Sequence, residues 1–403
     1  MSEMLTTISA ALAHLLAQVP TAPSCEEQCI DQALGRVLAA SCQATQDVPA
    51  YDNSAMDGYA VRCADITAPG TRVALSQTIA AGHPGTALAA GTAARIFTGA
   101  AIPNGADAVV MQENTHADNG TVTLLEQPQP GQNIRRHGHD VAQGSTVLSA
   151  GQRLRPQDLG LLASLGIGSV RVHRPLTVAL VNTGDEVIAP GTPLGPGQLY
   201  DSNSFMLAGL LAGLGLRVLR LGIVADTPTA TKTALRQAAA QADCVITTGG
   251  VSVGAEDHVR QAVTNLGQLS LWKLAIKPGK PFAFGSVAGT PFFGLPGNPV
   301  AVFVTFVTLV RPFLLRMQGA MSDPTPTFPV QAGFEILRPG TRQEYLRVKL
   351  SQTSQGPVAQ LFPDQGSSLL SSLSWADGLA LVPLGTTVAI GDSIDYLPFG
   401  GLL

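Results

Sequence analysis

Lysine is scarce in this chain of 403 residues, yet three of its five lysines fall within eight residues. Lys273, Lys277 and Lys280 stand in WKLAIKPGK, on either side of the apolar run LAI. The run predicts a buried strand, in which an unpaired lysine is costly, so we expect an anion as partner of these side chains. In extended chain Lys273 and Lys277 share one face, and the Pro-Gly turn redirects Lys280. The alternative is a solvated basic loop.

The stretch TTGGVSVGAEDH offers backbone in place of bulky side chains. It follows the apolar run CVI and includes Gly249, Gly250, Ser252 and Gly254. Bare backbone at the start of a helix can point N–H groups outward, and such groups bind phosphate. We therefore predict that a phosphate lies against this loop.

Acidic residues follow three of the predicted strands, in the loops TGDE and ADTP and at the end of the glycine-rich loop. Ligands of open α/β sheets bind outside the carboxyl ends of the strands, so these loops should share one rim. Carboxylate oxygens suit Mg²⁺, and together with bare amides they predict a site for Mg²⁺ and phosphate. Any one of these acids is better explained as a helix cap or turn former, and only the group of four favours a site. The four acids are Asp185, Glu186, Asp226 and Asp257.

The stretch LPGNPVAVF adds another loop to this rim, with Pro296 and Gly297 ahead of Asn298 and Pro299. Asn298 can cap the helix that follows, and Pro299 suits its first position. The same geometry would direct free amides at an oxyanion. Helix initiation and oxyanion binding both explain these residues, and the sequence leaves the two open.

Two motifs imitate other enzymes. GVSVG fits the nucleophile elbow of a hydrolase, but the only histidine after Ser252 is His258, six residues on, which argues against a triad. HGHD brings His137, His139 and Asp140 together without a further His or Cys nearby to complete a zinc shell, so a polar turn is the better interpretation. No G-x-G-x-x-G follows a strand in the place that a nicotinamide enzyme requires.

The elements that must position these loops alternate between strand and helix from residue 176 to a long helix that starts at Pro299. This alternation predicts right-handed βαβ units and a doubly wound, mostly parallel sheet covered on both faces. Residues 47–140 show short β-type runs between Gly, Pro and Asn, and predict a β-rich domain. The predicted domains are a linking domain from 1–46 with 141–175, the β-rich domain 47–140, the α/β domain 176–324, and a small C-terminal β-barrel domain 325–403.

Composition indicates a globular chain, with 45% hydrophobic and 13% charged residues. The net charge of −4 and the pI near 6.0 provide no overall basic field, so we expect neither nucleic acid nor membrane as a partner. The first residues predict an amphipathic helix in place of a signal peptide, and the apolar run 300–310 ends at Arg311, well short of the roughly 20 residues of a membrane span. We expect a cytoplasmic protein.

The five cysteines form neither a disulfide framework nor paired C-x-x-C zinc motifs. Cys25 and Cys29 are four residues apart, which suits one face of a helix. We expect all five to be reduced thiols.

Six stretches of the chain resemble, in this order, the MoeA and gephyrin E-domain family of molybdopterin molybdenumtransferases. They are DNSAMDGYAVR, FTGAAIPNGADAVVMQE, NTGDEV, TTGGVSVGAED, WKLAIKPGKPFAFG and GLPGNPV. The resemblance implies transfer of molybdenum from molybdate to adenylylated molybdopterin, with Mg²⁺ and with release of AMP. It also implies a MogA-like central domain and a homodimer whose active cleft joins the α/β domain of one subunit to the β-rich domain of the other.

The resemblance further implies a set of functional residues. Those expected to be catalytic are Asp57, Thr98, Glu186, Asp226, Asp257, Lys273 and Lys277. Our hypothesis is that Glu186, Asp226 and Asp257 hold the cation, while the two lysines neutralise molybdate or phosphate. No protein nucleophile is needed, because such transfers depend on positioning and charge stabilisation. Those expected to bind substrate are Gly249, Gly250, Ser252, Gly254, Lys280, Pro296, Gly297, Asn298, Pro299, Arg347 and Ser371.

Three stretches depart from the family's pattern. RHGHD replaces a frequent Arg-x-Gly-Glu-Asp, and ADTP replaces a loop in which a second acid is common. Ala301 stands where serine is frequent, which removes one candidate oxyanion donor.

Two other functions stay open. An adenylyltransferase would use the same α/β domain to make the adenylylated pterin from ATP, and such an enzyme could instead be a partner that supplies the substrate. A non-catalytic dimeric scaffold is the other alternative, and the full set of acids and lysines argues for retained chemistry.

Overall fold

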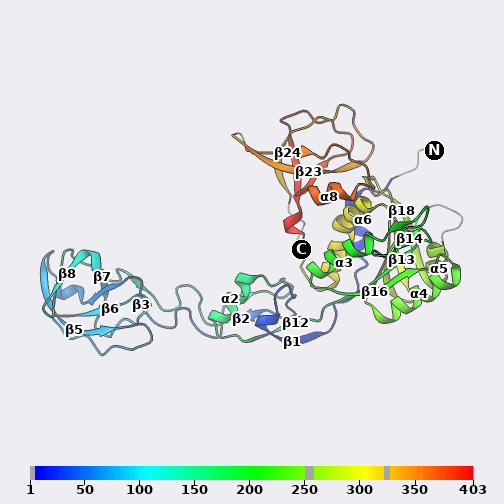
Figure 1. Cartoon of the computed structure of the whole chain (residues 1–403). Coiled ribbons are helices and arrows are strands. Elements are labelled where there is room, and N and C mark those ends of the chain that lie inside the picture. Colours follow the sequence, from blue (N-terminus) through cyan, green and yellow to red (C-terminus); the bar gives the residue numbers. More distant parts are fainter. Residues whose placement is uncertain (1–4, 250–257, 322–326, 355, 403) are drawn as a thin grey trace.

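The computed structural model describes residues 5–249, 258–321, 327–354 and 356–402, which form an elongated molecule (Figure 1). A β-rich domain stands at one end, and a small linking domain lies in the middle. An α/β domain and a C-terminal barrel together form the other end. The predicted fold class is confirmed, and the elongated arrangement separates the predicted site residues into two groups.

The β-rich domain contains a six-stranded sheet in the order β7-β4-β6-β5-β9-β8. Successive strand residues point to opposite faces, so Tyr59 and Val61 join one apolar cluster while Ala60 joins another. The domain joins the rest of the chain through the short antiparallel pair β3 (Asn53–Ser54) and β10 (Ile134–Arg135). The strands of the sheet are β4 (Gly58–Val61), β5 (Thr71–Ile79), β6 (Thr92–Ile96), β7 (Ala108–Met111), β8 (Thr115–Asp118) and β9 (Thr121–Leu124).

The linking domain combines two distant parts of the chain. Strand β1 (Cys25–Cys29) pairs with β12 (Ser169–His173), and β2 (Cys42–Gln43) pairs with β11 (Thr146–Leu148). Helix α2 (Pro156–Ser164) covers these strands and contributes Leu162 to their buried cluster. The helical interpretation of Cys25 and Cys29 is wrong, because these residues are the two ends of an exposed strand that pairs with β12. All five cysteines are free thiols.

The α/β domain contains a six-stranded sheet in the order β16-β13-β17-β21-β20-β18. Its first four strands are parallel, while β20 runs antiparallel to both of its neighbours. Alternate residues of β13 enter two apolar clusters, so the sheet is covered on both faces. The elements are β13 (Thr177–Thr183), α3 (Asn203–Gly213), β16 (Arg217–Val224), α4 (Pro228–Gln241), β17 (Cys244–Thr248), α5 (His258–Leu266), β18 (Gly267–Lys273), β20 (Pro281–Val287) and β21 (Thr290–Leu295).

The predicted long helix begins at Pro299 and is longer than its apolar run. It continues from α6 (Pro299–Thr305) through a π-helical turn (Phe306–Val310) into α7 (Arg311–Met317). The helix is long and apolar enough to cross a membrane, but 83% of its most apolar window is buried within the fold. It packs in the core together with the N-terminal helix α1 (Ile8–Leu16), whose Ala11 and Leu15 are fully buried.

The C-terminal domain is a closed barrel. Five strands pair in the order β23-β24-β22-β26-β25, and a pairing between β25 and β23 closes the ring. Helix α8 (Leu370–Trp375) lies beside the barrel, toward the α/β domain (Figure 1). The strands are β22 (Phe328–Ala332), β23 (Gln343–Thr353), β24 (Gly356–Leu361), β25 (Gly378–Val382) and β26 (Ser393–Pro398).

The strand predicted around the apolar run LAI is two elements in two sheets. Strand β18 ends at Lys273, and after a bend β19 (Ile276–Lys277) pairs in parallel with β23 of the C-terminal barrel. The residues between the two strands are buried as predicted, with Leu274 fully inaccessible to solvent. The lysine segment therefore joins the α/β domain to the barrel.

Candidate functional site

The α/β sheet has a topological switch point at β13. The chain leaves β13 through α3 to reach β16 on one side, and returns through α4 to reach β17 on the other side. Helices α3 and α4 pack on opposite faces of the sheet. We call the region outside the carboxyl ends of β13 and β17 the crevice, because open α/β sheets bind their ligands at such a switch point.

The loops after β13 and β16 bring carboxylates to this crevice. The backbone N–H of Asp226 donates to Asp185 Oδ1 at 3.3 Å, so the two loops are in contact. The Glu186 carboxylate folds back over Gly184, where a Cβ would lie 2.7 Å from Glu186 Oε2. Gly184 also has φ +136°, a conformation that favours glycine. Among the described residues, no three His, Cys, Asp or Glu side chains lie close enough to hold a metal ion.

Part of the predicted glycine-rich loop lies outside the described residues, namely Gly250, Ser252, Gly254 and Asp257. Gly249 is described and has φ +83°, which favours glycine. Its N–H donates to the carbonyl of Leu295 at 3.1 Å, so this amide is already used by the sheet. Gly249 therefore contributes backbone shape to the crevice and not the free N–H group that the sequence predicted.

A buried polar network underlies the crevice, and sequence reasoning missed it. Thr248 Oγ1 donates to Asn182 Oδ1 at 3.0 Å, and Asn182 Nδ2 donates to Asp201 Oδ1 at 2.7 Å. Ser204 donates to Asp201 through its backbone N–H at 3.0 Å and also through its hydroxyl. The sequence contains one sign of this network, Asp201 in YDSNS just before a helix. An acid at that position is ordinarily explained as a helix cap, so it does not point to a buried network.

The lysine segment borders a second hollow, between the α/β domain and the barrel. This cavity has a volume of about 420 Å³, and among its lining residues are Lys277, Asn298, Ala301, Arg342 and Ser367. The segments WKLAIKPGK and LPGNP, which 14 residues separate in the sequence, therefore meet at one place. Ala301 lines the cavity at the position of the absent hydroxyl.

Lys277 has an anionic partner within the protein itself, the carboxylate of Glu344. Its Nζ lies 3.2 Å from Glu344 Oε2 and 3.3 Å from Glu344 Oε1, across the β19–β23 pairing. The Lys277 side chain is 49% exposed, so an anion can reach it from solvent. Lys273 ends β18 opposite Pro281, and Lys280 lies between Gly279, which has φ +116°, and the start of β20.

Asn298 does not cap the helix with its side chain. Its Nδ2 instead donates to Ser367 Oγ of the C-terminal domain at 2.9 Å, and the N–H of Val300 donates to the Ser367 carbonyl. Pro299 occupies the first turn of the helix as predicted. The LPGNP loop thus starts a helix and also fastens the barrel to the α/β domain.

Arg347 is buried in the barrel, with 1% of its surface exposed. Its guanidinium donates to Ser372 Oγ at 3.0 Å and to the Gly366 carbonyl at 2.9 Å. Burial lowers the pKa of this guanidinium to about 10. The predicted Ser371 lies on the exposed side of α8, whereas its neighbour Ser372 is the serine that contacts Arg347.

Asp57 and Thr98 meet each other, but they meet none of the other predicted residues that the structure describes. Asp57 Oδ1 accepts from the N–H of Thr98 at 2.7 Å and from its hydroxyl at 2.8 Å, and these bonds lower the pKa of the Asp57 carboxyl. Both residues belong to the β-rich domain, at the opposite end of the molecule from the crevice (Figure 1). Large apolar side chains around them are exposed, at 47% for Tyr51, 42% for Met56 and 37% for Phe97.

The HGHD segment forms a turn, as predicted. Asp52 accepts from the N–H of His137 at 2.8 Å, and Asp47 Oδ2 lies 3.2 Å from His137 Nε2. The turn therefore closes the junction between the linking and β-rich domains.

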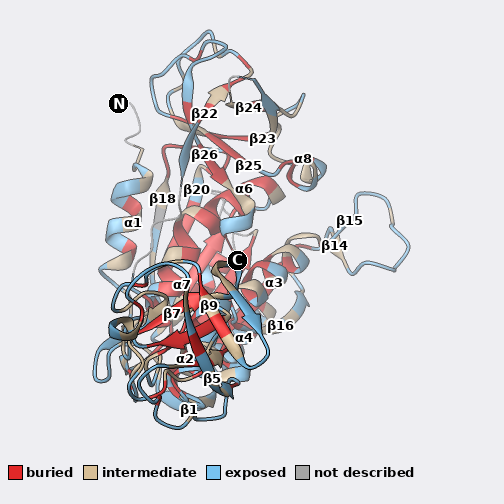
Figure 2. Ribbon diagram, turned by 90° about the vertical axis from the view of Figure 1, so that its left-hand side faces the viewer, coloured by how far each residue is buried: buried red, intermediate tan, exposed pale blue. Residues whose placement is uncertain are grey.

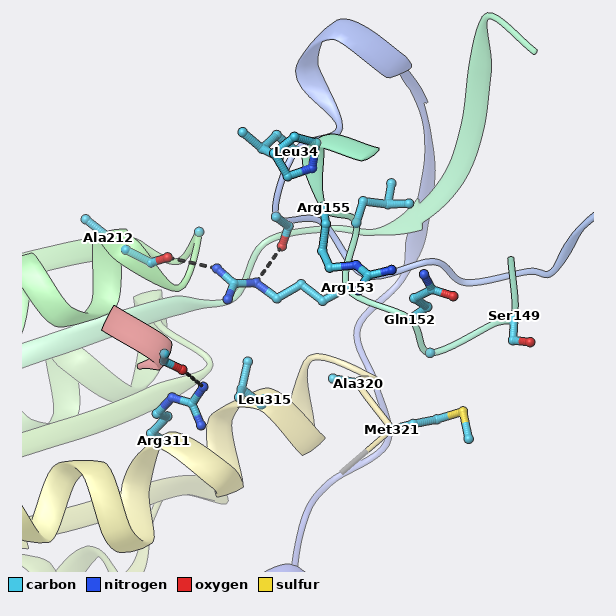
Figure 3. A pocket seen from close by; sticks show the side chains of 17 residues that line it. Leu34, Ser149, Gln152, Arg153, Arg155, Ala212, Arg311, Leu315, Ala320 and Met321 are labelled. Carbon is cyan, nitrogen blue, oxygen red and sulfur yellow. Dashed lines mark hydrogen bonds between the residues drawn. The ribbon is translucent and has the colours of Figure 1, made fainter. Parts of the chain in front are cut away.

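A larger cavity of about 1000 Å³ lies between the linking and α/β domains, and none of the predicted site residues that the structure describes lines it (Figure 3). Its arginines serve the fold: Arg153 donates to the carbonyls of Gly35 and Gly213, and Arg155 pairs with Asp158. Arg311 donates to the Leu402 carbonyl at 2.8 Å. This cavity therefore adds no group to the candidate site.

The fold is that of a multidomain α/β protein whose central sheet has a topological switch point, the place where such sheets bind ligands. Family models match in order along the chain: MoeA N-terminal region (domain I and II) at residues 6–166, probable molybdopterin binding domain at 179–316, and MoeA C-terminal region (domain IV) at 329–399. The chain belongs to the MoeA family.

Relatives extend over the whole chain. It is 40% identical over 401 residues to a protein of Haemophilus influenzae named molybdopterin molybdenumtransferase, covering 98% of this chain and 99% of that one. A protein of Nostoc sp. with the same name is 37% identical, covering 88% and 84% of the two chains. The crystal structure of a molybdopterin biosynthesis MoeA protein from Pyrococcus horikoshii OT3 is similar, with a TM-score of 0.85, 29% identity, and coverage of 98% and 100%.

Proposed function

We propose that this protein is a molybdopterin molybdenumtransferase, which inserts molybdenum into adenylylated molybdopterin and releases AMP. The observation that carries the proposal is the 40% identity, over nearly the whole of both chains, to a protein of that name. The crevice at the switch point supports it, because an adenylylated substrate needs a phosphate site at such a place.

The crevice residues suit Mg²⁺ in chemical type. The loops after β13 and β16 touch through Asp185 and Asp226, and their side chains offer the hard oxygen ligands that Mg²⁺ prefers. In our proposal Glu186, Asp226 and Asp257 hold the cation, with Asp257 outside the described residues. Bound Mg²⁺ would offset the charge that develops when the phosphoanhydride breaks.

The cavity beside Lys277 is the proposed site of molybdate. Lys277 and Arg342 supply positive charge there, and Asn298 and Ser367 supply polar groups. Molybdate is a tetrahedral dianion, so two cations at one wall favour its binding. Lys273 and Lys280 flank the same segment, and we assign them to the charge of molybdate or the substrate's phosphate. Arg347 holds the Gly366 carbonyl and thereby shapes the wall beside Ser367.

We further propose that the working form is a homodimer. Asp57 and Thr98 lie at the far end of one chain, so they can take part in the reaction only at another molecule's crevice. The exposed side chains of Tyr51, Met56 and Phe97 around them support a contact surface. We place the protein in the cytoplasm, where an adenylyltransferase would supply its substrate.

The test is AMP release from adenylylated molybdopterin with Mg²⁺, with and without molybdate. We expect release that depends on molybdate and yields active cofactor. An adenylate that binds and is never cleaved would make the protein a carrier or scaffold. Formation of the adenylate from ATP and molybdopterin would make it the adenylyltransferase.

A further inference from the structure

Asp201 is an acid that the proposed reaction does not use, yet the fold surrounds it with donors. It is 8% exposed, and its two carboxylate oxygens accept from Asn182 and twice from Ser204. Burying a carboxylate is costly unless it is fully hydrogen-bonded. Three hydrogen bonds hold this buried carboxylate in place beneath the crevice.

The carboxylate sets the direction of the whole network. An ionised carboxylate can only accept, so Asn182 must turn its amide nitrogen toward Asp201 and its amide oxygen toward Thr248. Thr248 then donates its single hydroxyl hydrogen to Asn182. Asn182 and Thr248 are register partners at the carboxyl ends of β13 and β17, so Asp201 locks together the two strands that flank the crevice.

Asp201 also closes the loop that carries Glu186. The loop of residues 183–186 joins Asn182 to strand β14 (Val187–Ile188), which pairs with β15 (Leu199–Tyr200). The N–H of Leu199 donates to the Glu186 carbonyl at 2.8 Å, and the N–H of Asp201 donates to the Ile188 carbonyl at 2.9 Å. Beyond these strands the segment projects from the body of the domain (Figure 2). The Asp201 backbone therefore holds one side of the Glu186 loop, and its side chain holds the other side through Asn182.

We propose that Asp201 is a positioning residue for the Mg²⁺ site, acting through Asn182 on the loop that carries Asp185 and Glu186. The proposal rests on the proposed function, since it assigns that loop to the cation. Groups that orient metal ligands without touching the metal commonly change metal affinity by about 10–100-fold when they are replaced.

The test exchanges the two side chains in a double variant, Asn182→Asp with Asp201→Asn, which we call the reversed pair. Asn182→Asp places two carboxylates face to face, whereas Asn182→Asp with Asp201→Asn restores a donor and an acceptor and keeps an acceptor for Thr248. The double variant gives up only the bond from the Ser204 N–H. Ser204→Ala is the matched control, because it removes a donor to the same carboxylate and leaves the bond to Asn182 intact. Asp201→Asn serves as the mild single variant if Asn182→Asp does not fold.

Two readouts on the full-length protein separate positioning from general stability. Hydrogen exchange at the amides of residues 184–188 reports on the loop, and Mn²⁺ binding with AMP, followed by electron paramagnetic resonance, reports on the cation. We expect Asn182→Asp to lose protection in the loop and to bind Mn²⁺ about ten-fold more weakly. The reversed pair should recover most of the loop's protection and most of the Mn²⁺ affinity. Ser204→Ala should change neither the protection nor the affinity.

Three results would overturn the proposal: unchanged exchange in the loop, altered exchange with unchanged Mn²⁺ affinity, or a reversed pair no better than Asn182→Asp. AMP release by the wild-type protein is measured separately. If wild type binds Mn²⁺ with AMP but cleaves no adenylate, the proposed function fails while the positioning role is still decided by these variants. If wild type binds no Mn²⁺, the positioning role fails as well.

Discussion

Two carboxylates of this protein are ordered in opposite ways. Asp57 lies near the surface of the β-rich domain and accepts two hydrogen bonds from one neighbour, Thr98. Asp201 is buried below the crevice and accepts from two residues that belong to a strand end and a helix. A carboxylate held in place while it faces solvent is available to another molecule, whereas a carboxylate that is buried and hydrogen-bonded within its own domain supports its neighbours. Position in the fold therefore distinguishes Asp57, which we propose takes part in the reaction, from Asp201, which we propose positions other residues.

The largest expected effect tests whether Asp57 serves another copy of the chain. Asp57→Ala and Glu186→Ala should each abolish AMP release, because each removes one half of the proposed shared cleft. Mixing the two variants under conditions of subunit exchange should restore about a quarter of wild-type activity, since half of the dimers then contain one intact cleft of two.

The control for this mixture is either variant exchanged with itself, which should stay inactive. If mixed dimers form and the mixture is still inactive, Asp57 does not lie in the shared cleft. The contrast between Asp57 and Asp201 would then be wrong.

The next effect concerns Asp257, which the proposal places among the cation ligands. Asp257→Ala should lower AMP release at least about ten-fold and raise the Mg²⁺ concentration needed for half-maximal rate, because one oxygen ligand is lost. Steady-state rates over a Mg²⁺ titration measure both quantities. A near wild-type rate at saturating Mg²⁺ would show that this carboxylate is not required.

A smaller effect, on molybdate binding, is expected for the ion pair of Lys277 and Glu344. Replacing one member should weaken binding, and replacing the other should strengthen it. Lys277→Ala should weaken molybdate binding several-fold, because it removes a cation from the cavity wall. Glu344→Gln should strengthen it, because Lys277 loses a competing anion at 3.2 Å. Calorimetric titration with molybdate at low ionic strength measures both, since exposed charges are screened by salt. Weaker binding by Glu344→Gln would mean that Glu344 orients Lys277 and does not compete for it.

The smallest effect is a pKa change at Asp57. The backbone N–H of Thr98 is the main cause of the lowered pKa, and the hydroxyl is the second. Thr98→Val keeps the N–H, so the pKa of the Asp57 carboxyl should rise only part of the way to its ordinary value. Because the pKa is lowered, these bonds stabilise the fold above the ordinary carboxyl pKa, and the stabilisation is lost as the pH falls through the lowered value. Carboxyl carbon chemical shifts over a pH titration follow the change, and an unaltered pKa in Thr98→Val would exclude the hydroxyl as a cause.

Much of the fold could be predicted because hydrophobic periodicity is local. The strand patterns RVLRLGIV and CVITT and the helix patterns around 203–213 and 228–241 match β16, β17, α3 and α4. Cys25 and Cys29 show the limit, because a spacing of four residues does not distinguish a helix face from the two ends of a strand. The exact domain boundaries stay a prediction.

The sequence by itself determined the layers, the doubly wound sheet and the family, because these depend on periodicity and on motifs within short stretches. Only the tertiary structure decided which polar groups meet: Lys277 with Glu344, Asn298 with Ser367, Asn182 with Asp201. Hydrogen bonds and ion pairs are satisfied by whichever group the fold brings within reach, and a partner 67 positions away leaves no periodic signal. The same reason explains why Asp201 reads as a helix cap in the sequence and as the base of the crevice in the fold.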